Sequence, residues 1–342
     1  MASLSESQRI GQLFIVGLMK DRLDATERAG IADYHFGSMT FTTQSGAGLA
    51  AISSITRAVQ ALATHANTGG VRFFVAANQE GGRIQGLSGP GFDTIPSALT
   101  QGTWSPGVLQ SRAARWGRQL RDAGVNLNFA PVADVVPRGT DAQNAPIGQL
   151  AREFGHDPAT VSSHVAAFIA GMRSAGIATS AKHFPGLGRV EGNTDFTAQV
   201  TDSVTTRDDP YLGPFKRAVA ERVPFVMVSL ATYEKLDPDH LAVFSPTITG
   251  GILRGDLGFR GVVISDALGA TAVESIPPGK RAIDFISAGG DLIISNQTPP
   301  AIEMARALDS RAAQSSSFRR RIDDAVVHVL RAKQAAGLLS CG

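Results

Sequence analysis

The feature that most constrains the fold of this chain is a regular alternation of short apolar runs with longer helical patterns. The runs are rich in residues that favour strands and are bounded by turn-forming residues. They are Leu13 to Gly17, Gly37 to Thr42, Phe73 to Ala77, Asn126 to Pro131, Ala178 to His183, Phe225 to Leu230, Val262 to Asp266 and Leu292 to Ser295. Near-continuous apolar strands joined by helices are typical of a covered parallel sheet, so the alternation predicts an α/β fold.

The segments between these runs carry apolar residues at three- and four-residue spacings, which is the period of a helix with one buried face. The clearest are Leu49 to Thr64, Gly107 to Ala123, Pro158 to Ser174, Asp209 to Arg222 and Lys280 to Ala288. The final segment, Ala301 to Leu339, is expected to form a long helix or a helix pair. Its docking face would consist of Ile322, Val326, Val329 and Leu330.

The number of strand and helix units distinguishes the possible α/β folds. At 342 residues the chain is long enough for one large barrel or for two ordinary domains. A doubly wound sheet normally has about five or six strands and a glycine-rich turn after the first, which "FIVGLMKDRL" does not offer. No linker or fixed repeat interrupts the series. We therefore predict a single-domain (β/α)8 TIM-type barrel with the C-terminal helix or helix pair packed on it.

The composition argues against a nucleic-acid partner. Lysine and arginine number 32 against 30 acidic residues, a formal charge of +2, and charged residues make up only 18% of the chain. A nucleic-acid-binding surface would require a stronger basic excess. The one cysteine, Cys341, excludes an intrachain disulfide and a thiolate zinc cage.

The start of the chain bears on its compartment. The apolar run Leu13 to Met19 is too short to span a bilayer, and no basic segment precedes it. We expect a soluble, cytoplasmic monomer without a membrane span. Alternatively, Met1, Ala2 and Ser3 replace a removed signal, and the protein is exported or lipid-anchored.

Polar side chains gather where the expected strands end, which is where the active sites of (β/α)8 barrels lie. These strand-end residues are Asn78, Gln79, Glu80, Asp134, Lys182, His183, Ser229, Ser265 and Asp266. Any one of them could be a turn residue or a helix cap. Together they predict a catalytic or binding site at this end of the barrel.

Five motifs carry a resemblance to a known family. In chain order they are "NQEGGR", "NFAPVADV", "AREFG", "KHFPGLG" and "VVISDALG". This set resembles glycoside hydrolase family 3, specifically its single-domain bacterial β-N-acetylglucosaminidases. The resemblance implies one barrel domain over residues 1 to 342, with a core from about residue 8 to 335. It also implies removal of terminal β-linked N-acetylglucosamine from small glycans or peptidoglycan-derived fragments, without a cofactor.

Cleavage of a β-glycoside with retention requires a carboxylate that attacks the anomeric carbon and a second group that transfers a proton. Asp266 matches the nucleophile of the family; the alternative is that it caps the next helix. Lys182, His183 and Arg152 match residues that bind sugar hydroxyls, and Asn78 stands where the family has a sugar-binding Asp. A Lys182–carboxylate pair that only supports the barrel mouth is the alternative for the lysine. Asp134 matches a residue beneath the site that binds substrate or orients Lys182 or Arg152.

The proton-transfer group departs from the family pattern. Family members carry Asp-Ser-His on the loop after the Lys-His strand, where this chain has Asn193, Thr194 and Asp195. Asp195 is therefore the candidate acid and base, provided that a partly apolar site raises its pKa. The alternative is a loop without catalytic function. We favour the first, because a carboxyl group is the usual proton donor in glycosidases.

Other departures leave the sugar and the reaction open. Gly86 stands where the family often has a sugar-binding Arg, and Leu230 replaces a family His. The alternatives are a non-catalytic sugar-binding protein of the same fold, a β-glucosidase and an N-acetylglucosaminide phosphorylase. No metal site is expected, because the remaining histidines lack metal-ligand spacing and are interpreted as surface or helix residues. They are His35, His65, His156, His164, His240 and His328.

Overall fold

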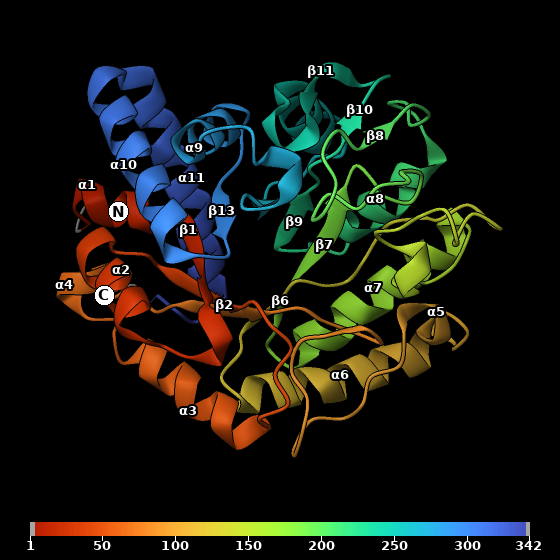
Figure 1. The fold of residues 1–342 in the computed structure, drawn as a ribbon. Helices are drawn as coiled ribbons and strands as arrows, with labels where there is room; N and C mark the ends of the chain where they lie inside the picture. Colours follow the sequence, from red (N-terminus) through yellow and green to blue (C-terminus); the bar gives the residue numbers. More distant parts are fainter. Residues whose placement is uncertain (1–3, 340–342) are drawn as a thin grey trace.

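Eight parallel strands close into a barrel in the computed structural model, which describes residues 4–339 (Figure 1). In spatial order the strands run β1-β13-β12-β9-β7-β6-β3-β2. Their bounds are β1 Phe14–Leu18, β2 Ser38–Phe41, β3 Phe74–Ala77, β6 Leu127–Asn128, β7 Ala178–Phe184, β9 Phe225–Val228, β12 Val262–Ala267 and β13 Leu292–Ser295. The predicted barrel and all eight predicted strands are confirmed. Met1, Ala2, Ser3 and Cys341 lie outside the described residues.

One strand is much shorter than its sequence predicts. The run Asn126 to Pro131 yields only the two residues of β6, because Pro131 has no backbone N–H to donate. At the start of the run, a side chain takes part in the strand pairing, since Oδ1 of Asn126 accepts from the backbone N–H of Val75 at 2.8 Å.

The interior of the barrel is filled by alternate residues of the strands, as the two-residue period of a strand requires. Ile15 and Ile264 point inward, for example, and Phe74 meets Phe225 edge to face with ring centroids 5.3 Å apart. The remaining strand residues, such as Val16, face the helices in a second, larger apolar layer. Packing on both faces of the strands holds the strand ends in fixed positions.

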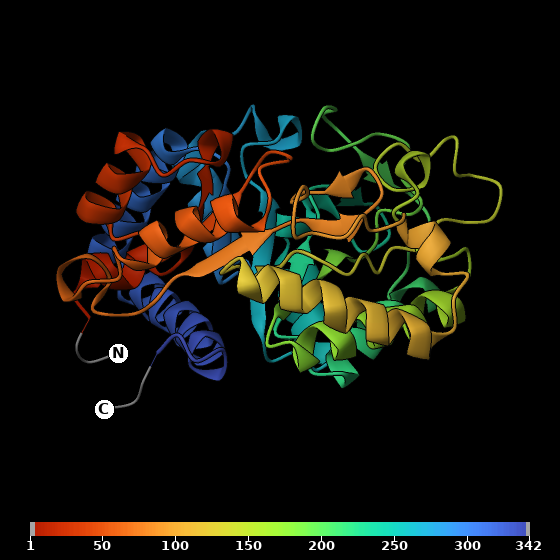
Figure 2. The ribbon, with the colours of Figure 1, turned by 90° about the horizontal axis from the view of Figure 1, so that it is seen from below.

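The helices surround this barrel (Figures 1 and 2). Their bounds are α1 Glu6–Gly11, α2 Ala25–Tyr34, α3 Leu49–Gln60, α4 His65–Thr68, α5 Ala98–Gln101, α6 Pro106–Asp122, α7 Pro158–Ser174, α8 Gly213–Ala220, α9 Pro278–Ser287, α10 Thr298–Gln314 and α11 Ser316–Ala335. The 3-10 segments are η1 Met19–Asp21, η2 Gly148–Leu150, η3 Pro210–Leu212, η4 Ala242–Phe244 and η6 Thr271–Val273, and η5 Thr247–Asp256 is a π-helix. Side chains of Ser105 and Asp157 cap α6 and α7.

The C-terminal segment is a helix pair, α10 and α11, as predicted. Its expected docking residues are buried, and Val329 belongs to the apolar cluster that fills the barrel. Lys333 of α11 is fully buried, and its Nζ donates to Oε1 of Gln12 and to the carbonyl oxygen of Gly37, both at 2.7 Å. Because these acceptors precede β1 and β2, α11 covers the end of the barrel opposite to the strand ends discussed below.

The loops at the carboxyl ends of the strands carry additional small sheets. β4 Gln79–Gly81 pairs with β5 Ile84–Gln85, and β8 Thr201–Asp202, β10 Thr232–Tyr233 and β11 Asp237–Leu241 form a second sheet. The loop of residues 137–157 lies on the side of the molecule away from α10 and α11 in both views (Figures 1 and 2). Within residues 4–339, no helix is both long and apolar enough to cross a membrane.

Candidate active site

A cavity of about 590 Å³ opens at the carboxyl ends of the strands. Residues from seven of the eight barrel strands or their ends surround it, with loop residues above them. Among its walls are Thr40, Phe41, Asn78, Gly86, Phe129, Arg152, Lys182, His183, Asn193, Asp195, Phe196, Met227, Asp266, Ile294 and Asn296. Six of the seven site residues predicted from the sequence therefore meet in one cavity. The seventh, Asp134, is fully buried and holds His183 from behind.

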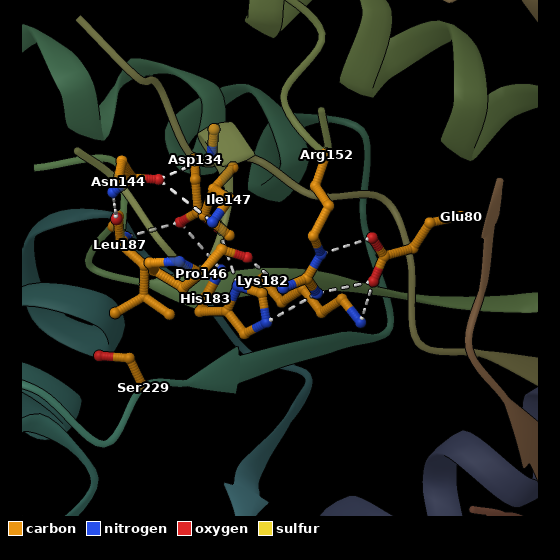
Figure 3. A network of polar contacts seen from close by, with 12 residues as sticks. Glu80, Asp134, Asn144, Pro146, Ile147, Arg152, Lys182, His183, Leu187 and Ser229 are labelled. Carbon is orange, nitrogen blue, oxygen red and sulfur yellow. Dashed lines mark hydrogen bonds and ion pairs between the residues drawn. The ribbon is translucent and has the colours of Figure 1, made fainter. Parts of the chain in front are cut away.

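Glu80 organises the cations of this cavity (Figure 3). Its two carboxylate oxygens accept from Nε and Nη2 of Arg152 at 2.9 and 2.8 Å, and its Oε1 lies 2.6 Å from Nζ of Lys182. The Glu80 and Lys182 side chains are only 3% and 2% exposed. The Lys182–carboxylate pair that the sequence left as an alternative is thus present, and the same lysine also lines the cavity.

The charge of Glu80 is fixed by these neighbours. Burial alone would raise the pKa of Glu80, but Arg152 and Lys182 outweigh it and hold the pKa at about 2. The carboxylate in turn raises the pKa of Arg152, against the opposing effect of burial. For Lys182, burial outweighs the attraction of Glu80 and lowers its pKa. Glu80 is the ionised centre of this group, because it interacts with two cations.

Asn78 contributes an acceptor beside the same lysine. Nζ of Lys182 donates to Oδ1 of Asn78 at 2.6 Å. The Asn78 amide is half-buried on the cavity wall, so its NH2 group remains a donor for a ligand.

Asp134 orients His183. Its Oδ2 lies 2.8 Å from Nδ1 of His183, and its Oδ1 accepts from the backbone N–H groups of His183 and Leu187 at 3.2 and 2.8 Å. The hydrogen bonds of Asp134 go to His183 and Leu187, whereas Glu80 forms the direct contacts to Lys182 and Arg152. A carboxylate at Nδ1 favours the tautomer with a proton on that nitrogen. Nε2, which lies 3.5 Å from Nη2 of Arg152, then faces the guanidinium as an acceptor.

The loop that carries Arg152 is fastened by a residue that the sequence did not single out. Nδ2 of Asn144 donates to the carbonyl oxygens of Leu187 and Val190, both at 2.7 Å. Its Oδ1 accepts from the backbone N–H of Gly148 at 2.8 Å. Asn144 is buried, so these bonds join the Arg152 loop to the start of the Asp195 loop. A single asparagine within "DAQNAPIG" gives no such signal in sequence.

The loop that carries Asp195 lies against the segment that follows Asp266. The backbone N–H of Asp195 donates to Oδ1 of Asn193 at 3.0 Å, so Asn193 forms the turn that presents the carboxyl. The N–H of Ala272 donates to the carbonyl oxygen of Thr194 at 3.1 Å. These bonds bring the two candidate catalytic carboxylates to the same cavity wall.

Asp195 has a perturbed acidity. Its pKa is raised, first by loss of hydration and then by the negative charge of Asp266, with Arg152, His183 and Lys182 acting in the opposite direction. Asp195 as a whole residue is exposed at the cavity mouth. A carboxyl with a raised pKa beside a second carboxylate is the arrangement typical of an acid–nucleophile pair.

Asp266 is not a helix cap. It is half-buried at the end of β12, and its Oδ1 accepts only from the backbone N–H of Ala267, at 2.8 Å, among the hydrogen bonds found for residues 4–339. The next helical segment, η6, begins at Thr271 and has Ala270 at its N-cap. The capping alternative therefore does not apply.

The departures from the family pattern have local reasons. The backbone N–H of Gly86 donates to the carbonyl oxygen of Asn78. A Cβ at Gly86 would lie 2.8 Å from that oxygen, so an arginine there would require a shifted backbone. Leu230 is fully buried in the helix-facing layer and is not a cavity residue.

Outside the cavity, Asp141, Glu153 and His156 form a group that could hold a metal ion.

Comparisons of sequence and structure identify similar proteins. A model of the glycosyl hydrolase family 3 N terminal domain matches residues 6–332. A crystal structure of β-N-acetylhexosaminidase from Beutenbergia cavernae is 45% identical, with a TM-score of 0.95 over 97% of this chain and 99% of that one. A β-hexosaminidase of Stenotrophomonas maltophilia is 28% identical over 90% of each chain. A β-N-acetylglucosaminidase/β-glucosidase of Cellulomonas fimi is 29% identical over 99% of this chain and 59% of its own length.

Proposed function

This chain belongs to glycoside hydrolase family 3, and we propose that it is a retaining exo-β-N-acetylglucosaminidase that works by double displacement. Asp266 is the proposed nucleophile and Asp195 the proposed acid and base. The observation that carries this proposal is that both carboxyls line one cavity together with Arg152, Lys182 and His183. The relatives named as hexosaminidases support the choice of sugar.

The shape and lining of the cavity suit the end of a sugar chain. Residues from seven strands or their ends line it, and the apolar filling of the barrel lies below it, so a terminal sugar could enter but a chain could not pass through the barrel. Its floor contains Phe129, Met227 and Ile294, which also belong to the apolar filling of the barrel. A pyranose has apolar faces and polar edges, so an apolar floor below charged walls fits it.

In the first step, a carboxylate oxygen of Asp266 attacks the anomeric carbon while the bond from that carbon to the leaving oxygen breaks. The protonated Asp195 gives its proton to that oxygen, and a covalent glycosyl-enzyme forms. Hydrogen bonds from Arg152, Lys182 and Asn78 would hold the sugar hydroxyls in position. Glu80 and Asp134 would act as positioning residues.

In the second step, Asp195 takes a proton from water, the water oxygen attacks the anomeric carbon, and Asp266 leaves. Formation of the ester removes the negative charge of Asp266, which is one of the causes of the raised pKa of Asp195. The pKa of Asp195 should therefore fall in the intermediate. This change suits a group that must first donate a proton and then accept one.

Two further assignments are part of the proposal. Small glycans or peptidoglycan-derived fragments are the proposed substrates, and the proposed enzyme is a monomer. A β-glucosidase remains the second candidate, because the Cellulomonas fimi relative carries both activities in its name and because Asn78 and Gly86 depart from the usual sugar contacts.

A panel of nitrophenyl glycosides tests the proposed function. The β-N-acetylglucosaminide should be cleaved at least about 10-fold faster than the β-glucoside, with the β-configured sugar as first product. Preference for the glucoside would instead establish the second candidate. If no glycoside is cleaved while N-acetylglucosamine raises the melting temperature, the protein is a sugar-binding protein without turnover. Release of sugar phosphate in phosphate buffer would identify a phosphorylase.

A further inference from the structure

Glu153, the residue after the cavity arginine, is a fully buried carboxylic acid without a hydrogen-bond partner. Its exposed fraction is 0%, and neither of its oxygens has a donor within residues 4–339. A buried carboxylate without donors is unfavourable by several kcal/mol or more, on the order of the cost of removing an ion from water. Some other species must therefore neutralise this group, either a proton or a cation.

Two further ligand atoms lie next to it. Asp141 and His156 each offer one atom, and these two atoms and one Glu153 oxygen all lie within 4.8 Å of one another. Oδ1 of Asp141 is also buried without a hydrogen-bond partner, and Nδ1 of His156 lies 3.6 Å from it. Three buried oxygens thus lack donors at one place. His156, which was expected from its sequence context to be a surface or helix residue, is half-buried in this group.

The backbone is arranged to bring these residues together. A Cβ at Gly148 would lie 2.7 Å from Cα of Asp141, so the glycine permits the loop to fold back on itself there. The carbonyl oxygen of Val136 lies 3.2 Å from Nδ1 of His156. The same nitrogen lies 3.6 Å from Oδ1 of Asp141, so Val136 and Asp141 together place the imidazole in this group.

We propose that Asp141, Glu153 and His156 bind one divalent transition-metal ion, such as Zn²⁺, which fastens the loop that presents Arg152 to the cavity. Two carboxylates and an imidazole form a donor set that suits Zn²⁺ better than Mg²⁺ or Ca²⁺, which prefer oxygen ligands alone. The ion has a structural role. Because Glu153 directly follows Arg152 in the chain, fixing one limits the movement of the other.

Calorimetric titration of the chelator-treated full-length protein with Zn²⁺ tests this site. We expect one ion per chain, a rise in melting temperature on binding, and affinity at least about 10-fold weaker for Mg²⁺ and Ca²⁺. Glu153→Gln should weaken Zn²⁺ binding at least about 10-fold, because an amide cannot supply a negatively charged ligand. His240→Ala is the matched control: His240 forms an exposed pair with Asp237 at 3.0 Å, and its loss should leave the binding unchanged.

Proton release gives a second measure of the same site. Desolvation, together with the nearby Asp141, raises the pKa of Glu153 to about 8, so we expect Glu153 to carry a proton at pH 7 when no metal ion is bound. Asp141 and His156 are the other titratable groups that face it. A metal ion must displace this proton. Titrations at pH 7 in two buffers of different ionisation enthalpy should therefore show release of about one proton per ion, and less in Glu153→Gln.

The same pKa predicts the effect of the variant without metal. Between the ordinary pKa of 4.5 and the folded value of about 8, the native state binds more protons than the unfolded state, so Glu153 lowers stability as pH rises through this range. Glu153→Gln should accordingly be at least as stable as the metal-free wild type at pH 8. If Glu153→Gln fails to fold, His156→Ala provides the same titration. Absence of Zn²⁺ binding to the wild type, or binding that survives both substitutions, would overturn the proposal.

Discussion

Nζ of Lys182 lies 2.6 Å from Oε1 of Glu80, and both side chains are almost completely buried. Lys182 lies near the carboxyl end of β7, and Glu80 belongs to the β4–β5 hairpin that follows β3. A buried lysine is costly unless a carboxylate accompanies it. The pair therefore explains how the cavity keeps a cation in place to meet a polar ligand.

Glu80→Gln should disrupt this arrangement. The substitution leaves Arg152 and Lys182 without their shared anion, so we expect a loss of about 3–5 kcal/mol in unfolding free energy and of about 10²-fold in kcat/KM from misplacement. The wild type should also lose stability as pH falls from the ordinary pKa of 4.5 toward about 2, because protonation of Glu80 removes the pairing. Denaturant unfolding between pH 2 and 7 measures the loss of unfolding free energy and its dependence on pH, and kcat/KM is measured separately. The variant should lack the loss of stability between pH 4.5 and about 2.

Asp93→Asn is the control for Glu80→Gln. Asp93 pairs with Arg115 at 2.7 Å, but the arginine side chain is 65% exposed. An exposed pair contributes no more than about 1 kcal/mol, and activity should not change. Equal effects of the two substitutions would contradict the positioning role of Glu80.

Asp195→Ala tests whether Asp195 is the proton donor, because it removes the proposed acid and leaves the proposed nucleophile in place. Loss of the acid should slow cleavage of a natural disaccharide by about 10²-fold or more. The first step with a nitrophenyl glycoside should survive, since a nitrophenolate leaves without protonation. Added azide should then restore turnover and give the β-glycosyl azide, because azide needs no deprotonation.

Asn193→Ala is the matched control for Asp195→Ala, since Asn193 forms the turn and transfers no proton. It should reduce turnover of the disaccharide far less than Asp195→Ala does. If Asp195→Ala slows both substrates equally and azide rescues neither, Asp195 is a structural residue.

The charge of Asp266 should influence the titration of Asp195. Because the charge of Asp266 raises the pKa of Asp195, Asp266→Asn should lower it. Carbon-13 NMR of labelled aspartate carboxyls, with Asp195→Ala used to assign the signal, measures this pKa in both proteins. An unchanged value would mean that Asp266 and Asp195 do not interact in the cavity.

Lys333 gives a test of the fold that is independent of the site. Burial lowers its pKa to about 7 from 10.5, so between these values the unfolded state binds more protons than the native state. Stability should rise with pH across this window, by up to about 1.4 kcal/mol per unit from this group. Lys333→Met should remove that part of the slope in denaturant unfolding at pH 7, 8 and 9. Equal slopes would show that Lys333 stays charged in the fold.

The barrel could be predicted because its signal is local and repeated. Most strands lie in short, mainly apolar runs and the long helices have one apolar face, so these patterns identified all eight strands and the C-terminal pair. The β6 boundaries were wrong because strand pairing there depends on a side chain of Asn126 and on the missing N–H of Pro131. These details depend on neighbours that are distant in sequence.

The cavity residues were predictable by type, but their partners were not. Polar residues at strand ends identified Asp266, Lys182 and His183 as members of one site. Barrel closure decides which carboxylate faces which cation, and it pairs Glu80 with Lys182 and Asp134 with His183. Sequence spacing contains no information on this choice, which is why the role of Glu80 was missed.

Trapping of the covalent intermediate tests the central claim most directly. A 5-fluoro-β-N-acetylglucosaminyl fluoride should form the glycosyl-enzyme readily and hydrolyse it slowly, because fluorine destabilises the oxocarbenium-like transition states while the leaving group is activated. Mass spectrometry of a proteolytic digest then locates the label. We predict one sugar per chain, attached to Asp266 and absent from Asp266→Asn. A label on Asp195, Glu80 or Asp134, or complete cleavage without any covalent adduct, would contradict the account.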